Sequence, residues 1–175
     1  MNRAFVFKHR GALLALPAVL LAACGKPSAK SAAAGIPIAV AGELLRCWAV
    51  GYSGTTTRAD ALQAPSLATA GPYAYVRNPL YVGNFVTALG FLIAYTGASS
   101  VRMRAALTAL TLGSMAAVYA TIVPYEEEFL RSEFGPAYER YRQYVPAIVP
   151  AFTGYDRAEG TWRPQTIAQA ESRTF

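Results

Sequence analysis

Histidine and cysteine are scarce in this chain of 175 residues. The one histidine is His9, and the two cysteines, Cys24 and Cys47, both lie in apolar stretches. Two cysteines do not make a disulfide framework, and this set is too small for the usual four-ligand zinc site. The sequence therefore predicts no bound metal ion and no catalytic cysteine or histidine.

Charged residues are also few. They make up 15% of the chain, against roughly 25% in soluble domains, while 54% of the residues are hydrophobic. The net charge is +6, but the 16 basic residues are scattered, and no dense basic run or nucleic-acid-binding motif is present. We therefore expect a membrane protein with no nucleic-acid partner.

Long apolar runs account for the high hydrophobic content. Residues 80–98 and 105–123 are free of charge, and each would cover about 28 Å as a helix, close to the roughly 30 Å hydrocarbon core. Both runs are rich in the small residues that let membrane helices pack closely. Residues 35–52 are apolar except for Glu43 and Arg46, which lie on one helix face. We expect three spanning helices here, although a buried soluble helix would also explain 35–52.

The N-terminal apolar segment, residues 11–24, has two interpretations. It has 14 residues, contains Pro17, and follows a basic stretch, as in a signal peptide. The letters LAAC at 21–24 resemble a lipoprotein cleavage box that would leave Cys24 as a lipidated N-terminus. Alternatively, the segment is a short or tilted first span.

The fold class that follows is an all-α integral membrane bundle of about four transmembrane helices with a cytoplasmic C-terminal helical segment. We expect a single domain at 1–150 and a polar tail at 151–175. Residues 124–150 predict two short helices broken at Gly135-Pro136, either in the headgroup layer or packed on the helix ends. The distribution of basic residues predicts cytoplasmic termini, in a bacterial inner membrane.

The short connection between the third and fourth runs predicts an antiparallel hairpin, because only residues 99–104 separate them. Arg77-Asn78-Pro79 should therefore lie near Glu126-Glu127-Glu128. Pro79 suits the first turn of a helix, and the free N–H groups of that turn can hold an anion. Such a site would suit a zwitterionic cofactor with a cationic centre. Taken singly, each motif also fits a membrane anchor or a solvated face.

At these residues the sequence resembles the isoprenylcysteine carboxyl methyltransferases and the related phospholipid methyltransferases. The family pattern runs G-x-Y, R-H-P-x-Y, two helices, E-E-x-x-L-x-x-x-F-G, Y-x-x-Y and V-P. The matching residues, within about 55–150, are Gly71, Tyr73, Arg77, Asn78, Pro79, Tyr81, Glu126, Glu127, Leu130, Phe134, Gly135, Tyr138, Tyr141, Val145 and Pro146.

The resemblance implies an integral-membrane enzyme that uses S-adenosyl-L-methionine and methylates a lipophilic acceptor, a prenylcysteine-like carboxylate or a phospholipid amine. It places cofactor contacts on Leu67, Ala68, Tyr73, Asn78, Pro79, Leu80, Tyr81 and Glu126. It makes Arg77, Glu126 and Glu127 the catalytic candidates.

Two positions depart from the family pattern. Asn78 stands where the family has histidine, and asparagine cannot titrate. Ile122 stands where the eukaryotic prenylcysteine enzymes contact substrate through arginine. Two alternatives follow: a non-catalytic membrane interaction protein of the same fold, or a lipoprotein anchored through Cys24.

Overall fold

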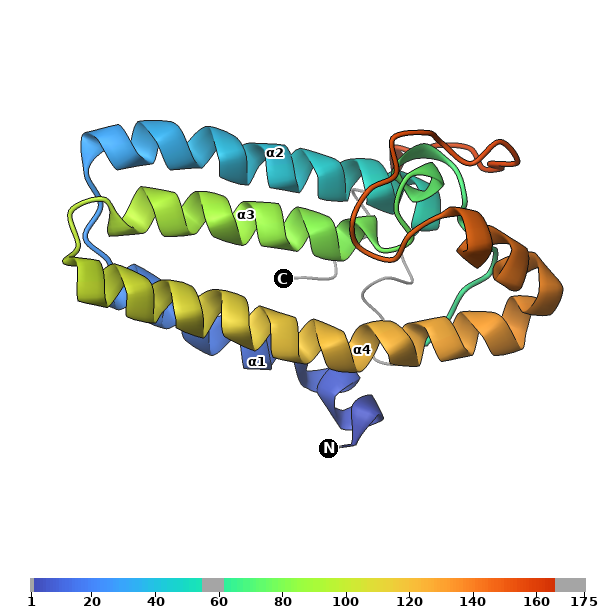
Figure 1. Ribbon diagram of the computed structural model, residues 1–175, viewed down its shortest axis with the longest axis horizontal. Coiled ribbons are helices and arrows are strands. Elements are labelled where there is room, and N and C mark those ends of the chain that lie inside the picture. The colour runs from blue at the N-terminus through green and yellow to red at the C-terminus, as the bar shows by residue number, and fades with distance from the viewer. Residues whose placement is uncertain (1, 55–61, 166–175) are drawn as a thin grey trace. The chain divides into compact units, whose positions relative to one another are not determined.

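The computed structural model describes residues 2–54 and 62–165 (Figure 1). Its α-helices are α1 (Arg3–Cys24), α2 (Ala29–Ser53), α3 (Pro79–Thr96) and α4 (Val101–Tyr144), and a short 3-10 helix, η2, covers Gly71–Ala74. No strand occurs within these described ranges. All four α-helices are long and apolar enough to cross a membrane. The predicted all-α class and the four spans are confirmed.

The first helix is longer than the sequence suggested. It begins at Arg3, where the Asn2 side chain caps it by accepting a hydrogen bond from the Ala4 amide. The basic residues belong to the helix: Arg10 lies over the Phe7 ring and donates to the Phe7 carbonyl. With 22 residues, α1 can span a bilayer without lipoprotein processing.

The chain divides into two compact units. Unit 1 comprises Met1–Glu43 and Gly83–Val123, and unit 2 comprises Leu44–Val82 and Pro124–Phe175. Residues 55–61 and 166–175, which include part of the expected family match and of the polar tail, lie outside the described residues.

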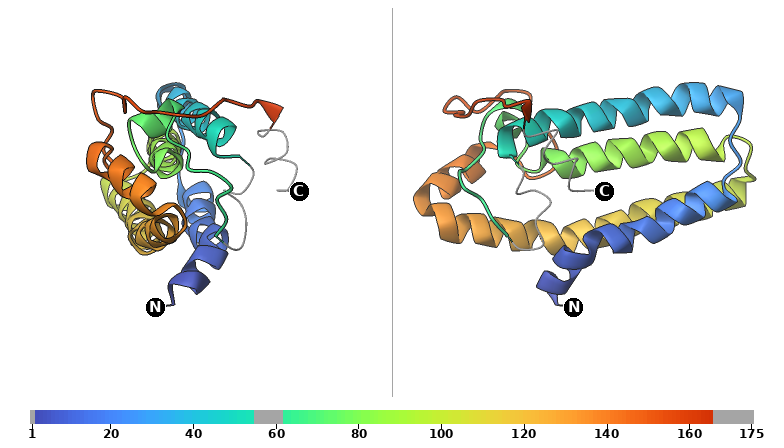
Figure 2. Two further views of the ribbon diagram at one scale, coloured as in Figure 1. Left: turned by 90° about the vertical axis from the view of Figure 1, so that its right-hand side faces the viewer. Right: turned by 180° about the vertical axis from the view of Figure 1, so that it is seen from behind.

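In unit 1, small residues bring α2 and α3 into backbone contact. The two helices run side by side in both views (Figures 1 and 2). A Cβ atom on Gly35 would collide with the Gly90 carbonyl, and one on Gly90 would collide with the Ala39 amide. Farther along, a Cβ on Gly42 would meet Thr87. This close packing is the role expected of small residues in membrane helices.

The two hairpin turns of unit 1 are bonded to each other. The Ala98 amide donates to the Lys26 carbonyl at 2.8 Å, and the Lys26 amide donates to the Ser99 hydroxyl at 3.1 Å. The turn between α3 and α4 is as short as predicted. The predicted hairpin of α3 and α4 is therefore confirmed.

The fourth helix does not end with its apolar run. It continues through Pro124 to Tyr144 as one element, with a bend at Gly135, where φ is 48° and ψ is −122°. The expected break at Gly135 is confirmed, since glycine tolerates this positive φ. The expected separate helix after residue 123 is wrong, because α4 continues through Pro124. Proline lacks an N–H, yet the helix is not broken there.

Candidate functional site

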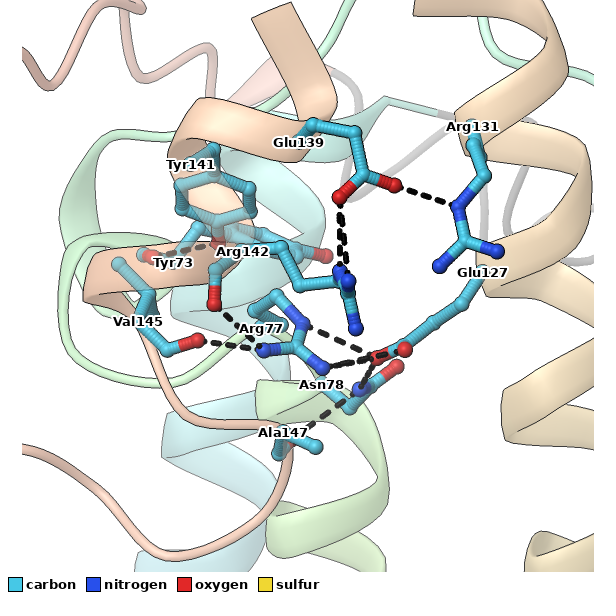
Figure 3. Close-up of polar contacts among 10 residues, drawn as sticks. All are labelled: Tyr73, Arg77, Asn78, Glu127, Arg131, Glu139, Tyr141, Arg142, Val145 and Ala147. Carbon is cyan, nitrogen blue, oxygen red and sulfur yellow. Dashed lines mark hydrogen bonds and ion pairs between the residues drawn. The ribbon is translucent and has the colours of Figure 1, made fainter. Parts of the chain in front are cut away.

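Within unit 2, the residues just before α3 meet the acidic triplet of α4, as the hairpin predicted. Arg77 pairs with Glu127: its Nη2 lies 2.8 Å from Oε1 and 3.1 Å from Oε2, and its Nε lies 3.0 Å from Oε1 (Figure 3). The Asn78 amide nitrogen also donates to Glu127, at 3.3 Å. Two chain segments that are far apart in sequence are thereby joined by a charge-assisted bidentate contact.

All three nitrogens of the Arg77 guanidinium donate hydrogen bonds to other residues of unit 2. The two remaining N–H groups, on Nη1, have the carbonyl oxygens of Val145 at 2.6 Å and Arg142 at 3.3 Å as acceptors. A guanidinium has five N–H donors, and five acceptor contacts are present. The Arg77 side chain is 11% exposed and that of Glu127 18%. Each of the three guanidinium nitrogens therefore donates within unit 2.

The start of α3 is fastened to residues 146 and 147. The Arg77 amide donates to the Pro146 carbonyl at 2.8 Å, and both the amide and the side chain of Asn78 donate to the Ala147 carbonyl, at 3.2 and 3.1 Å. The Asn78 carbonyl in turn accepts the amides of Tyr81 and Val82. These four amides are paired within the protein, so the expected free N–H groups are not found among them.

A second carboxylate of the triplet, Glu126, accepts a 2.7 Å hydrogen bond from the Tyr81 hydroxyl on α3. Tyr73 of η2 is buried in the same unit. Burial raises the pKa of the Tyr73 hydroxyl well above its ordinary value, a hydrogen bond with Ser53 lowers it in part, and the negative charge of Glu126 raises it further. Tyr73, Tyr81 and Glu126 form what we call the tyrosine–glutamate cluster.

The aromatic residues after the Gly135 bend form a core. Tyr138, Tyr141 and Val145 are each at most 2% exposed, and Leu67 packs against them. The Tyr141 hydroxyl donates to the Tyr73 carbonyl at 2.7 Å (Figure 3). These three residues are therefore packed inside unit 2.

The other expected site residues are covered to different degrees. Pro79 is fully buried, and Ala68 and Leu80 are half-buried. Ile122, where the resemblance predicted a departure from the eukaryotic prenylcysteine enzymes, is fully buried in unit 1.

The described part of the C-terminal tail holds unit 2 together in a way the sequence did not indicate. We call residues 151–163 the strap. Its amide groups at Ala151, Tyr155, Glu159 and Arg163 donate to the carbonyls of Tyr75 and Ala74, the Thr69 hydroxyl and the Gly51 carbonyl, respectively. The indole of Trp162 lies against Gly51, where a Cβ atom would overlap it. Backbone acceptors give no sequence signal, and Gly51 was the only available hint.

Comparison with known proteins identifies a family model and several relatives. The family model described as phospholipid methyltransferase matches residues 31–137. The chain is 36% identical over 97 residues to the cobalt-zinc-cadmium resistance protein CzcN of Cupriavidus metallidurans, covering 55% of this chain and 41% of CzcN. It is 39% identical over 84 residues to the protein-S-isoprenylcysteine O-methyltransferase of Schizosaccharomyces pombe, covering 48% of this chain and 33% of that protein.

A third relative is methanethiol S-methyltransferase 2 of Bradyrhizobium diazoefficiens, 29% identical over 118 residues, covering 67% of this chain and 40% of the relative. The matched region thus spans about a third to two fifths of the length of these curated relatives. No solved structure matches the chain.

Proposed function

Because the chain belongs to the phospholipid methyltransferase family, we propose that it is an integral-membrane methyltransferase that uses S-adenosyl-L-methionine and acts on a lipophilic acceptor. The observation that carries the proposal is the 2.7 Å hydrogen bond between Tyr81 and Glu126. It gathers a carboxylate and aromatic rings beside the start of α3, within the family match. Both termini face the cytoplasm of a bacterial cell in this proposal.

The tyrosine–glutamate cluster fits the cofactor. When bound, S-adenosyl-L-methionine would supply a methyl group from a cationic sulfonium, and the neutral thioether S-adenosylhomocysteine would be the leaving group. A carboxylate and tyrosine ring faces attract such a cation, and the neutral Tyr73 hydroxyl adds no competing charge. Glu126 and Tyr81 bind and orient the cofactor, with Leu67, Ala68, Asn78, Pro79 and Leu80 as the other expected contacts.

Arg77 and Glu127 are positioning residues in this proposal. Their charges neutralise each other, and the guanidinium donors are all engaged within unit 2. Their contribution is to hold the start of α3 against α4, so that Tyr81 reaches Glu126. Methyl transfer depends on holding the acceptor about 3 Å from the methyl carbon more than on a strong acid or base, so a positioning role suits the chemistry.

The relatives differ in the chemical class of the group that accepts the methyl group. One relative is named for an isoprenylcysteine and another for methanethiol, so carboxylate and thiol acceptors both occur among them, and the family model is named for phospholipids. The buried Ile122 offers no cation to a substrate carboxylate. This observation favours an acceptor without a carboxylate, such as a phospholipid amine.

Cofactor binding tests the proposal directly. Isothermal titration of the purified protein with S-adenosylhomocysteine should show binding that Glu126→Gln weakens at least tenfold. Glu133→Gln, which changes an exposed carboxylate of the same helix, should bind as the unmodified protein does. Undiminished binding by Glu126→Gln would remove Glu126 from the site, and no binding by the unmodified protein would favour a non-catalytic family member.

The acceptor is then identified from the product. Membranes that contain the protein are incubated with methyl-labelled cofactor, and the label is separated into lipid, protein and small-molecule fractions. Label in lipid that depends on Glu126 supports a lipophilic acceptor. Label only in a volatile or water-soluble fraction contradicts it.

A further inference from the structure

Large apolar side chains stand exposed on unit 2 from the last residue of α4 to the first residues of the strap. Tyr144 is 68% exposed, Val149 75%, and Phe152 is fully exposed. Ile148 is 39% exposed. Residues after Tyr144 are not helical, so the lipid-facing side of a spanning helix does not account for them. We call residues 144–152 the apolar loop.

Hydrogen bonds of its backbone attach the apolar loop to unit 2. The Pro146 and Ala147 carbonyls accept hydrogen bonds from the amides of Arg77 and Asn78, and the Ala151 amide donates to the Tyr75 carbonyl. Proline at 146 and 150 fixes φ at two more points. The backbone of the apolar loop is thus bonded to unit 2 on both sides of Val149.

Charged residues of both signs flank the apolar loop. Arg140 and Arg142 lie within residues 140–155, and Glu139 and Asp156 lie directly beside that range. Arg140 is exposed, and Arg142 pairs with Glu139 on the same helix. Basic side chains next to exposed aromatic and aliphatic ones are typical of segments that lie at the boundary between lipid headgroups and acyl chains.

We propose that the apolar loop inserts into the headgroup–acyl boundary of the bilayer in which the helices lie, with Val149 and Phe152 as its deepest side chains. A bilayer is the occupant that the observations favour, because the chain has four helices able to span one and α4 leads directly to the loop. The exposed Arg140 complements anionic headgroups. The inference stands apart from the proposed methyl transfer, since it uses none of the tyrosine–glutamate cluster.

Accessibility of spin labels in a membrane tests this inference. In a full-length chain with Cys24→Ser and Cys47→Ser, single cysteines replace Val149, Phe152 or, as the matched control, the exposed Arg157 of the strap. Each labelled protein is reconstituted into phosphatidylcholine–phosphatidylglycerol vesicles. Collision rates are measured with oxygen, which concentrates in lipid, and with a nickel chelate, which stays in water.

The expected ratio of oxygen to nickel collisions is several-fold higher at 149 and 152 than at 157. Because all three side chains are exposed, the substitutions remove no packing, and gel filtration verifies the fold. Equal ratios at the three positions would overturn the inference. Labels at 149 and 152 that are shielded from both reagents would also overturn it, and would indicate that protein, such as a second copy, covers the loop.

A second variant checks the result without a label in the loop's centre. Adding Val149→Glu to the chain labelled at 152 should shift the ratio at 152 toward that of position 157, because a carboxylate at this depth is unfavourable. An unchanged ratio at 152 would contradict insertion.

Discussion

The guanidinium of Arg77 and the carboxylate of Glu127 form a bidentate ion pair that ties the start of α3 to α4 within unit 2. The same guanidinium donates a hydrogen bond to the carbonyl of Val145, which lies after the Gly135 bend. One side chain therefore links three segments. The tyrosine–glutamate cluster depends on that junction for its geometry.

Neutralising Glu127 should destabilise the protein. Glu127→Gln keeps the volume but leaves a mostly buried guanidinium without its counter-charge, and breaking such a pair costs roughly 3 kcal/mol. Unfolding by denaturant in mild detergent, followed by circular dichroism, gives the free-energy change. The control is Glu139→Gln, which breaks the exposed pairs with Arg131 and Arg142 and should lower the stability far less, because water screens exposed charges. Equal losses in the two variants would show that the Arg77 pair has no special weight.

Removing the Tyr81 hydroxyl should weaken cofactor binding while leaving the fold intact. Tyr81→Phe deletes the hydrogen bond to Glu126, and a hydrogen bond to a charged group contributes about 1.5–3 kcal/mol. The expected result is a dissociation constant for S-adenosylhomocysteine raised at least about tenfold. Tyr144→Phe, which alters an exposed tyrosine of α4, should bind normally. Unchanged affinity in Tyr81→Phe would detach Tyr81 from the binding site.

The close approach of α2 and α3 makes Gly90 intolerant of a side chain. Gly90→Val places carbon atoms where the Ala39 backbone lies, so the helices must separate along their contact. We expect a sharply lower yield of monodisperse protein in size-exclusion chromatography. Gly113→Ala is the control, because a Cβ there meets nothing within 4 Å and alanine is the better helix former by about 1 kcal/mol. Normal yield for Gly90→Val would mean that the helices do not touch there.

Enlarging Gly51 should release the strap. Gly51→Leu removes the space that Trp162 occupies, and the neighbouring bond from the Arg163 amide to the Gly51 carbonyl should be lost with it. Limited trypsin digestion should then cut after Arg157 several times faster than in the unmodified protein. Ala41→Leu makes a similar increase on an exposed position of the same helix and should leave the cleavage rate unchanged. Identical rates in both variants would argue against the strap contact.

Hydropathy and spacing predicted the features that follow from length. Two apolar runs of equal length joined by a short turn have their outer ends on the same side of the bilayer. This argument from length predicted that Arg77 and Glu127 lie close together. The pattern was less informative about α1, because Arg3, Lys8 and Arg10 look like a signal-peptide flank although they lie in the helix. Helix continuation through Pro124 was missed because proline usually ends or kinks a helix.

The strap could not be predicted, for a different reason. Its partners are mainly main-chain carbonyls, which every residue carries, so the contacts of Ala151, Tyr155 and Arg163 leave no mark in the sequence. The apolar residues of the loop can be read from the sequence. Whether Phe152 is exposed or buried, however, can be known only from the structure. The burial of Tyr138 and Tyr141 likewise became known only from the structure.

The junction at Arg77 also has a consequence for the order of events at the ribosome. The acceptors of Arg77, on Glu127, Arg142 and Val145, are translated well after Arg77 itself. Arg77 therefore cannot form these contacts until both helices of the hairpin have been synthesised. The nascent chain can close this half of the molecule only after residue 147 has left the exit tunnel. A pause in translation before that point would leave the Arg77 guanidinium without these acceptors during membrane insertion.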